Sequence, residues 1–137
     1  MCVLKIYSDT FSFKGFAENT KIPILSIFDK GEYRDQKQTR RVSQNTLSLD
    51  VSDKEWGDFP GQASDAIEFL SKHQNELLKI LSSISDVKAC LDFPIYSRLD
   101  GNIINQNDYI PRELVCLAGK LNLEIGMSQY SKEALEQ

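Results

Sequence analysis

Residues 87–95 contain the most regular pattern in the chain, and it strongly limits the possible folds. Apolar side chains occupy every second position, at Val87, Ala89, Leu91, Phe93 and Ile95. Lys88, Cys90 and Asp92 stand between them. This alternation is typical of a strand that buries one face and leaves the other to solvent. It favours an antiparallel or mixed sheet with helices packed on one face only.

Four further segments have strand character. Residues 2–7 are bulky and β-favouring, and residues 22–28 are apolar but contain Pro23, which suits a sheet edge or a strand start. Residues 46–51 alternate like the segment above, and so do residues 123–130. The pattern therefore predicts five strands.

Three segments favour helices. Residues 11–17 follow the possible N-cap residues Ser8 to Thr10 and predict a short helix. A long helix is predicted over residues 65–84, because its leucines recur with helical spacing. A third helix should start near Pro111 and end at Leu121. The segment before the long helix, residues 52–63, contains Gly57, Pro60 and Gly61 and is predicted to be a loop.

The elements combine into one α+β domain of order β-α-β-β-α-β-α-β. The length of 137 residues fits a single domain. We expect the domain to cover residues 1–130 and residues 131–137 to form a C-terminal tail. No internal repeat or linker divides the chain.

The arrangement as a whole resembles a family of small bacterial domains of unknown function. The resemblance rests on Gly31 after the second apolar segment, on the strand at 46–51 and on the long helix. It is best over residues 110–125, where a short helix runs directly into a strand that finishes in Tyr130. It implies the fold and transfers no activity, cofactor or catalytic residue.

The cysteines and the N-terminal sequence indicate the cellular compartment in which the chain is found. Cys2, Cys90 and Cys116 are odd in number and widely spaced, whereas secreted disulfide-stapled domains have an even, dense set. No basic stretch followed by an apolar one opens the chain, and the apolar runs are too short to span a membrane. We therefore expect a cytoplasmic, reducing setting without membrane association.

Charge is distributed unevenly along the chain. Residues 1–45 carry eight Lys/Arg and five Asp/Glu, whereas residues 46–137 carry eight and fifteen. The acidic body disfavours broad nucleic-acid binding. A local basic loop remains possible, with its cations at Lys30, Arg34, Lys37, Arg40 and Arg41. Acidic residues dilute this loop and Tyr33 is its only aromatic side chain, so a solvated loop is the favoured interpretation.

A second charged loop surrounds the only tryptophan. Its members are Asp53, Glu55, Trp56, Asp58 and Phe59. Aromatic side chains ringed by charge are good anchors for a protein partner, so these five residues are the interface candidates. The favoured interpretation, however, has Trp56 and Phe59 covering the core while the carboxylates are solvated.

Catalytic and ligand-binding patterns are weak. With one histidine and no paired cysteines, we expect no metal site, and the scattered glycines form no phosphate loop, so we expect no cofactor. No catalytic residue is assigned. A pocket between sheet and helices, if one exists, has four candidate lining residues, which are His73, Cys90, Asp92 and Tyr96.

Two functions are compatible with these features. The favoured hypothesis is a non-enzymatic protein-binding module, such as an immunity protein or an antitoxin, with an unidentified partner. The alternative is a small-molecule-binding domain or minor enzyme that uses a pocket between sheet and helices. The sequence predicts no oligomeric state.

Overall fold

The computed structural model describes residues 1–135 and has the predicted α+β order. The strands are β1 (Cys2–Ser8), β2 (Ile24–Phe28), β3 (Asn45–Ser52), β4 (Lys88–Tyr96) and β5 (Glu124–Tyr130). The helices are α1 (Lys14–Asn19), α2 (Phe59–Ser83) and α3 (Arg112–Lys120), followed by one 3₁₀ turn, η1 (Lys132–Leu135).

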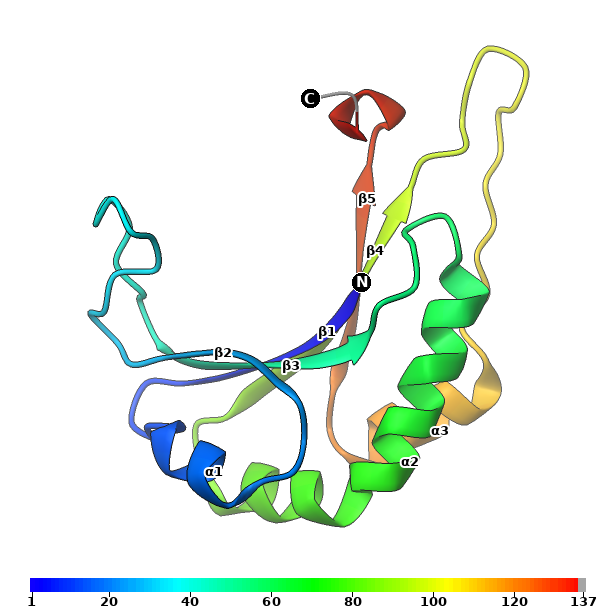
Figure 1. The fold of residues 1–137 in the computed structure, drawn as a ribbon. Helices are drawn as coiled ribbons and strands as arrows, with labels where there is room; N and C mark the ends of the chain where they lie inside the picture. Colours follow the sequence, from blue (N-terminus) through cyan, green and yellow to red (C-terminus); the bar gives the residue numbers. More distant parts are fainter. Residues whose placement is uncertain (136–137) are drawn as a thin grey trace.

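All five strands form one mixed sheet of order β2-β3-β1-β4-β5. Neighbouring strands are antiparallel except β4 and β5, which run parallel. A parallel pair needs a crossover, and α3 supplies it. Figure 1 shows the three α-helices on one side of the sheet, while no helix covers the other side. We call that other side the open face.

The core lies between the sheet and the helices. Leu91 and Phe93 of β4 are fully buried there, as are Leu4 and Ile6 of β1. The alternation in residues 87–95 therefore marks the helix-covered face, as predicted. Lys5 and Cys90 are paired across β1 and β4 on the open face and are only partly buried.

The start of α2 differs from its prediction. The helix begins at Phe59, six residues before Asp65, and Pro60 lies in its first turn. Pro is tolerated there because the first helical amides have no partner within the helix. Asp58 caps the helix, since its side chain accepts a hydrogen bond from the Gly61 amide at 2.9 Å.

Three other segments refine the sequence interpretation. The first helix covers Lys14–Asn19, later than expected, because Ser8 accepts hydrogen bonds from the Thr10 and Phe11 amides and holds a turn there. Residues 29–45 form an ordered hairpin in which Tyr33 and Arg41 are bridged. Of the predicted C-terminal tail, η1 is helical, and residues 136–137 lie outside the described part.

Asp86 joins two connections at one end of the sheet. Its carboxylate accepts hydrogen bonds from the Ser8 hydroxyl, the Thr10 hydroxyl and the Asp9 amide, at 2.7–3.0 Å. The bond from Ser8, the largest cause, and those from Thr10 and Asp9 hold the Asp86 pKa below its usual value. The turn after β1 is thereby fastened to the turn before β4.

Within residues 1–135, no helix is both long enough and apolar enough to cross a membrane.

Gly61 should be required by the cap of α2. A Cβ at position 61 would lie 2.2 Å from Asp58 Oδ2, so the Asp58 carboxylate would have to leave its capping position. We expect Gly61→Ala to lower the free energy of unfolding by about 1 kcal/mol, the usual value of an N-cap. The matched control is Gly119→Ala in α3, where a Cβ meets no atom within 4 Å. That change should stabilise by about 0.5–1 kcal/mol. Urea unfolding of both variants measures the difference, and equal effects would contradict the role of the cap.

Candidate functional site

Three aromatic side chains meet at one end of the open face. Trp56, from the loop between β3 and α2, stacks on Tyr130 with ring centroids 4.6 Å apart and an interplanar angle of 28°. Its centroid also lies 5.2 Å from that of Tyr96. We call these three residues the aromatic cluster. Tyr130 remains about two-fifths exposed, so part of the cluster is accessible to a partner.

The sheet register explains why the two tyrosines are adjacent. Tyr96 ends β4, Tyr130 ends β5, and the parallel pairing places them side by side. Tyr96 lies four residues after Asp92 in β4, and Tyr130 lies two residues after Ser128 in β5. Because alternate residues of a strand point to the same side, both tyrosines lie on the open face with Asp92 and Ser128. The Trp56 carbonyl accepts a hydrogen bond from the Tyr96 amide at 3.3 Å, which continues the outline of the sheet beyond the end of β1.

Gln62 holds the Trp56 loop from the helix-covered side of the sheet. This side chain of α2 is fully buried, and its amide group donates to the Pro94 carbonyl at 2.9 Å and to the Glu55 carbonyl at 3.2 Å. One side chain therefore ties helix, strand and loop together. The Gln62 Oε1 atom has no hydrogen-bond partner within residues 1–135, so the two bonds that the amide nitrogen donates are what join the helix to the loop and to β4.

Charged groups surround the aromatic cluster. A hollow of about 480 Å³ is lined by Trp56, Tyr96, Met1 and residues 53–55. The side chains of Asp53 and Glu55 are exposed at its rim. The Met1 ammonium donates to the Lys54 carbonyl at 3.0 Å, and burial lowers the pKa of this ammonium. The rim is therefore mixed in charge within an acidic half of the chain.

The structure separates the five predicted interface residues. Trp56 belongs to the aromatic cluster, Asp53 and Glu55 stand at its rim, and Asp58 caps α2. Phe59 does not reach the surface: it is 2% exposed and packs edge-to-face on Phe93, with centroids 5.4 Å apart. Phe59 therefore covers the core, as the favoured interpretation of this loop predicted, because as the first residue of α2 it points inward and is not available to an interface.

Polar side chains form a network in the middle of the open face. Lys5 Nζ lies 3.2 Å from Asp92 Oδ2, and the Ser128 hydroxyl donates to Asp92 Oδ1 at 2.7 Å. Gly126 leaves the room that this network needs, since a Cβ there would lie 3.2 Å from Cys90 Sγ. Burial, followed by the nearby Asp92 and Glu124, raises the pKa of the Cys90 thiol. The thiol is thus protonated at neutral pH and is a poor nucleophile.

The four predicted pocket residues do not converge. Cys90, Asp92 and Tyr96 lie on the open face, whereas His73 belongs to α2 on the opposite side of the sheet. His73 packs edge-to-face on Phe69, with centroids 4.9 Å apart, and lines a separate hollow of about 350 Å³. Burial and the neighbouring Lys72 lower its pKa. His73 and Cys90 are therefore not in contact.

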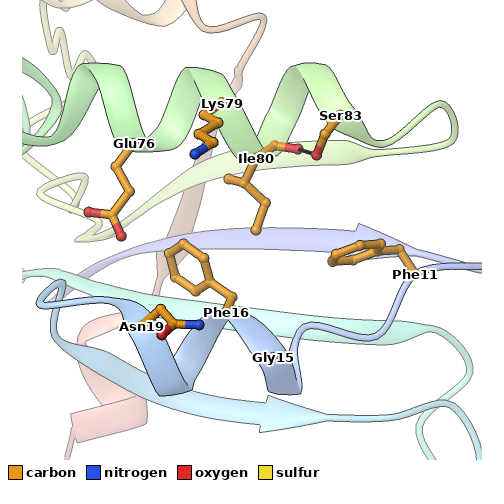
Figure 2. Close-up of a pocket in the computed structure, with 8 residues that line it drawn as sticks. All are labelled: Phe11, Gly15, Phe16, Asn19, Glu76, Lys79, Ile80 and Ser83. Atoms are coloured by element: carbon orange, nitrogen blue, oxygen red, sulfur yellow. Dashed lines mark hydrogen bonds between the residues drawn. The ribbon is translucent and has the colours of Figure 1, made fainter.

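An apolar groove lies between α1 and α2. Figure 2 shows Phe11, Phe16 and Ile80 directed toward it from three segments, with Glu76 and Lys79 along its rim. Its volume is about 360 Å³. The Thr20 hydroxyl donates to the Glu76 carboxylate at 2.5 Å, which fastens the end of α1 to α2 on one side of the groove. Sequence reasoning did not identify this groove, because it depends on how two helices pack.

The basic hairpin uses two of its arginines internally. The Arg41 guanidinium lies 4.6 Å from the centroid of the Tyr33 ring and donates to the Tyr33 hydroxyl at 2.8 Å. The Arg34 guanidinium lies 5.9 Å from the Phe28 centroid. Lys37 and Arg40 are exposed. All four of these basic side chains are nevertheless exposed to solvent.

Residues 1–135 contain no group of three or more His, Cys, Asp or Glu side chains that could hold a metal ion. Comparisons with protein-family models, with curated proteins and with solved structures give no significant match. The resemblance to small bacterial domains of unknown function therefore stays a prediction.

Removing the Gln62 amide should release the Trp56 loop. Gln62→Leu removes the donor from the buried Pro94 carbonyl and from the partly buried Glu55 carbonyl, which costs about 1–3 kcal/mol of the free energy of unfolding. As Trp56 is the only tryptophan, its fluorescence should shift to the red and become easier to quench with acrylamide. The control is Gln74→Leu in the same helix, where the side chain makes no hydrogen bond within residues 1–135. Unchanged quenching in Gln62→Leu would show that the loop is held by other contacts.

Proposed function

We propose that the chain is a non-enzymatic, cytoplasmic protein-binding module, comparable in role to an immunity protein or an antitoxin. The observation that carries the proposal is the aromatic cluster of Trp56, Tyr96 and Tyr130 on a sheet face that no helix covers. Rigid aromatic side chains at a partly exposed site are the residues that most often dominate binding energy.

The charges favour a basic partner. Residues 46–137, which contain all three members of the aromatic cluster, carry fifteen Asp/Glu and eight Lys/Arg. Asp53 and Glu55 stand next to the cluster, so a Lys or Arg of the partner can contact both a carboxylate and an aromatic ring. An acidic surface of this kind complements a protein whose own surface is built to contact nucleic acid.

The surroundings of Cys90 support a non-enzymatic role. Cys90 has a raised thiol pKa and lies on the opposite side of the sheet from His73, so neither activates the other. The free cysteines, of which Cys116 is exposed, suit a reducing compartment.

Replacing the tryptophan should remove most of the binding. After the partner has been isolated by co-purification from the native host, Trp56→Ala should weaken its binding by about 2 kcal/mol, or roughly thirtyfold. The double change Asp53→Asn and Glu55→Gln should lower the association rate and its dependence on salt. Isothermal titration calorimetry and stopped-flow measurements test the two effects.

Tyr33→Ala is the matched control, because it removes an aromatic side chain stacked with an arginine on the hairpin instead. It should leave the affinity unchanged. The proposal fails if the chain binds no other protein at physiological concentration, or if Tyr33→Ala weakens binding as much as Trp56→Ala. Loss of partner binding in Tyr33→Ala would instead implicate the basic hairpin. Nucleic-acid binding by the native chain would then be measured at rising salt, since phosphate contacts weaken steeply with salt concentration.

The groove between α1 and α2 supports a second candidate function, the binding of a small apolar molecule. Its lining by Phe11, Phe16 and Ile80 carries this alternative (Figure 2). Gly15 also lines the groove, and a Cβ built there meets no atom within 4 Å. A longer side chain at position 15 can therefore fill the groove without disturbing the core.

We expect an anilinonaphthalene sulfonate dye to bind the native chain and to fluoresce when bound. Gly15→Met should lower the apparent affinity for the dye, measured by fluorescence titration, by at least about tenfold. Gly119→Met in α3 has equally free space around its Cβ and should change nothing. Equal dye binding in both variants would exclude the groove as the site.

A further inference from the structure

The outer edge of β5 differs from the edge at the other side of the sheet. β2 follows Pro23 and has a register irregularity between Ile24 and Ser26, two features that commonly protect an edge from pairing. β5 has seven residues in regular register, without proline, lysine or bulge. Its outer edge has no partner strand among residues 1–135.

The backbone of β5 presents alternate residues to the free edge. The Tyr130 carbonyl accepts from the Ser97 amide at 2.8 Å, so the backbone of Tyr130 points toward β4. In a parallel ladder, the residues of a strand bond alternately to one neighbour and to the other. The N–H and C=O groups of Ile125, Met127 and Gln129 therefore point outward, where they have no backbone partner in the described chain.

We propose that a second copy of this chain pairs with this edge, β5 against β5, antiparallel and centred on Met127. In this register Met127 pairs with Met127 of the second copy, and Ile125 pairs with Gln129. Each of these pairs can exchange two backbone hydrogen bonds. The result is one continuous sheet through both copies, related by a two-fold axis.

The position of Glu124 favours the antiparallel arrangement over the parallel one. Glu124 is the only charged residue of β5, and the antiparallel register places it opposite the neutral Tyr130 of the second copy. An in-register parallel pairing would set Glu124 against Glu124, which is unfavourable. Antiparallel pairing of two copies of β5 therefore brings no like charges opposite each other.

Apolar residues beside the edge give the pairing a hydrophobic component. Of the twelve large apolar residues exposed in the described chain, seven lie between Leu99 and Tyr130, around β5. Met127 is 39% exposed, and it lines a hollow of about 480 Å³ together with Leu99 and with Ile104, which is 91% exposed. A second β5 at this edge brings its own Met127 and Ile125 next to these side chains.

This pairing does not depend on the proposed function, because it uses the edge of β5 and not its open face. The two surfaces are nevertheless adjacent. Glu124 of the second copy would lie beside Tyr130 and add a carboxylate to the surroundings of the aromatic cluster.

Sedimentation velocity over a range of concentrations tests the proposal on the purified chain alone. We expect a species of twice the monomer mass of 15.6 kDa at high concentration. Met127→Lys places two like charges opposite each other and should weaken association at least about tenfold. The control Leu25→Lys changes a 48% exposed residue on the protected edge, and it should dimerise like the native chain.

Hydrogen exchange on the native chain identifies the edge without any substitution. The amides of Ile125, Met127 and Gln129 should become protected as the concentration rises, whereas those of Ile24 and Leu25 should not. A chain that stays monomeric at all concentrations overturns the proposal, and so does a dimer that Met127→Lys leaves intact. Neither outcome bears on the binding of another protein by the aromatic cluster.

Discussion

The packing of all three α-helices against one face of the sheet is the constraint on which the rest of the structure depends (Figure 1). It obliges every central strand to alternate, with Leu4, Leu49 and Leu91 buried in neighbouring positions of three strands. The same alternation sends polar side chains to the open face, where no other element can satisfy them. Some of them are paired with one another, as in the contacts of Asp92 with Lys5 and Ser128, whereas Asp50 Oδ1 is buried without a hydrogen-bond partner in residues 1–135. The open face therefore carries its own polar contacts without a cover, and it is available to a partner.

The aromatic cluster arises where this arrangement ends. The parallel pairing of β4 and β5 brings Tyr96 and Tyr130 together, and β1 is too short to continue beside them. The loop that contains Trp56 occupies the vacant place, and its carbonyl accepts the Tyr96 amide. Gln62 keeps that loop in position from the helix-covered side. The candidate site therefore depends on backbone pairing and on one buried amide more than on the acidic residues around it.

The fold follows from burial patterns within single elements, whereas the aromatic cluster follows from the pairing of strands. This difference explains how much of the fold and of the candidate site could be predicted from the sequence. Periodicity reports burial along a single element, so the five strands, the three α-helices and the one-sided packing followed from it. It cannot report which strands are neighbours, and hence Tyr130 was not associated with Trp56, nor was His73 separated from Cys90. The start of α2 was misplaced because Pro60 and Gly61 usually break helices, whereas in a first turn Pro lacks only an unused donor and Gly leaves room for the Asp58 cap.

A sheet that is covered on one face has two further places where apolar groups and backbone donors stay accessible, namely the ends of its strands and its edges. In this chain the hairpin that follows β2 and the proline before it restrict one edge. At the other edge, β5 contributes both an unpaired backbone and, through Tyr130, part of the aromatic cluster. The two surfaces therefore share one strand: the outward backbone of Ile125, Met127 and Gln129 forms the free edge, while the side chain of Tyr130 belongs to the aromatic cluster. Because successive residues of a strand point in different directions, one short segment can serve the edge and the open face with different groups.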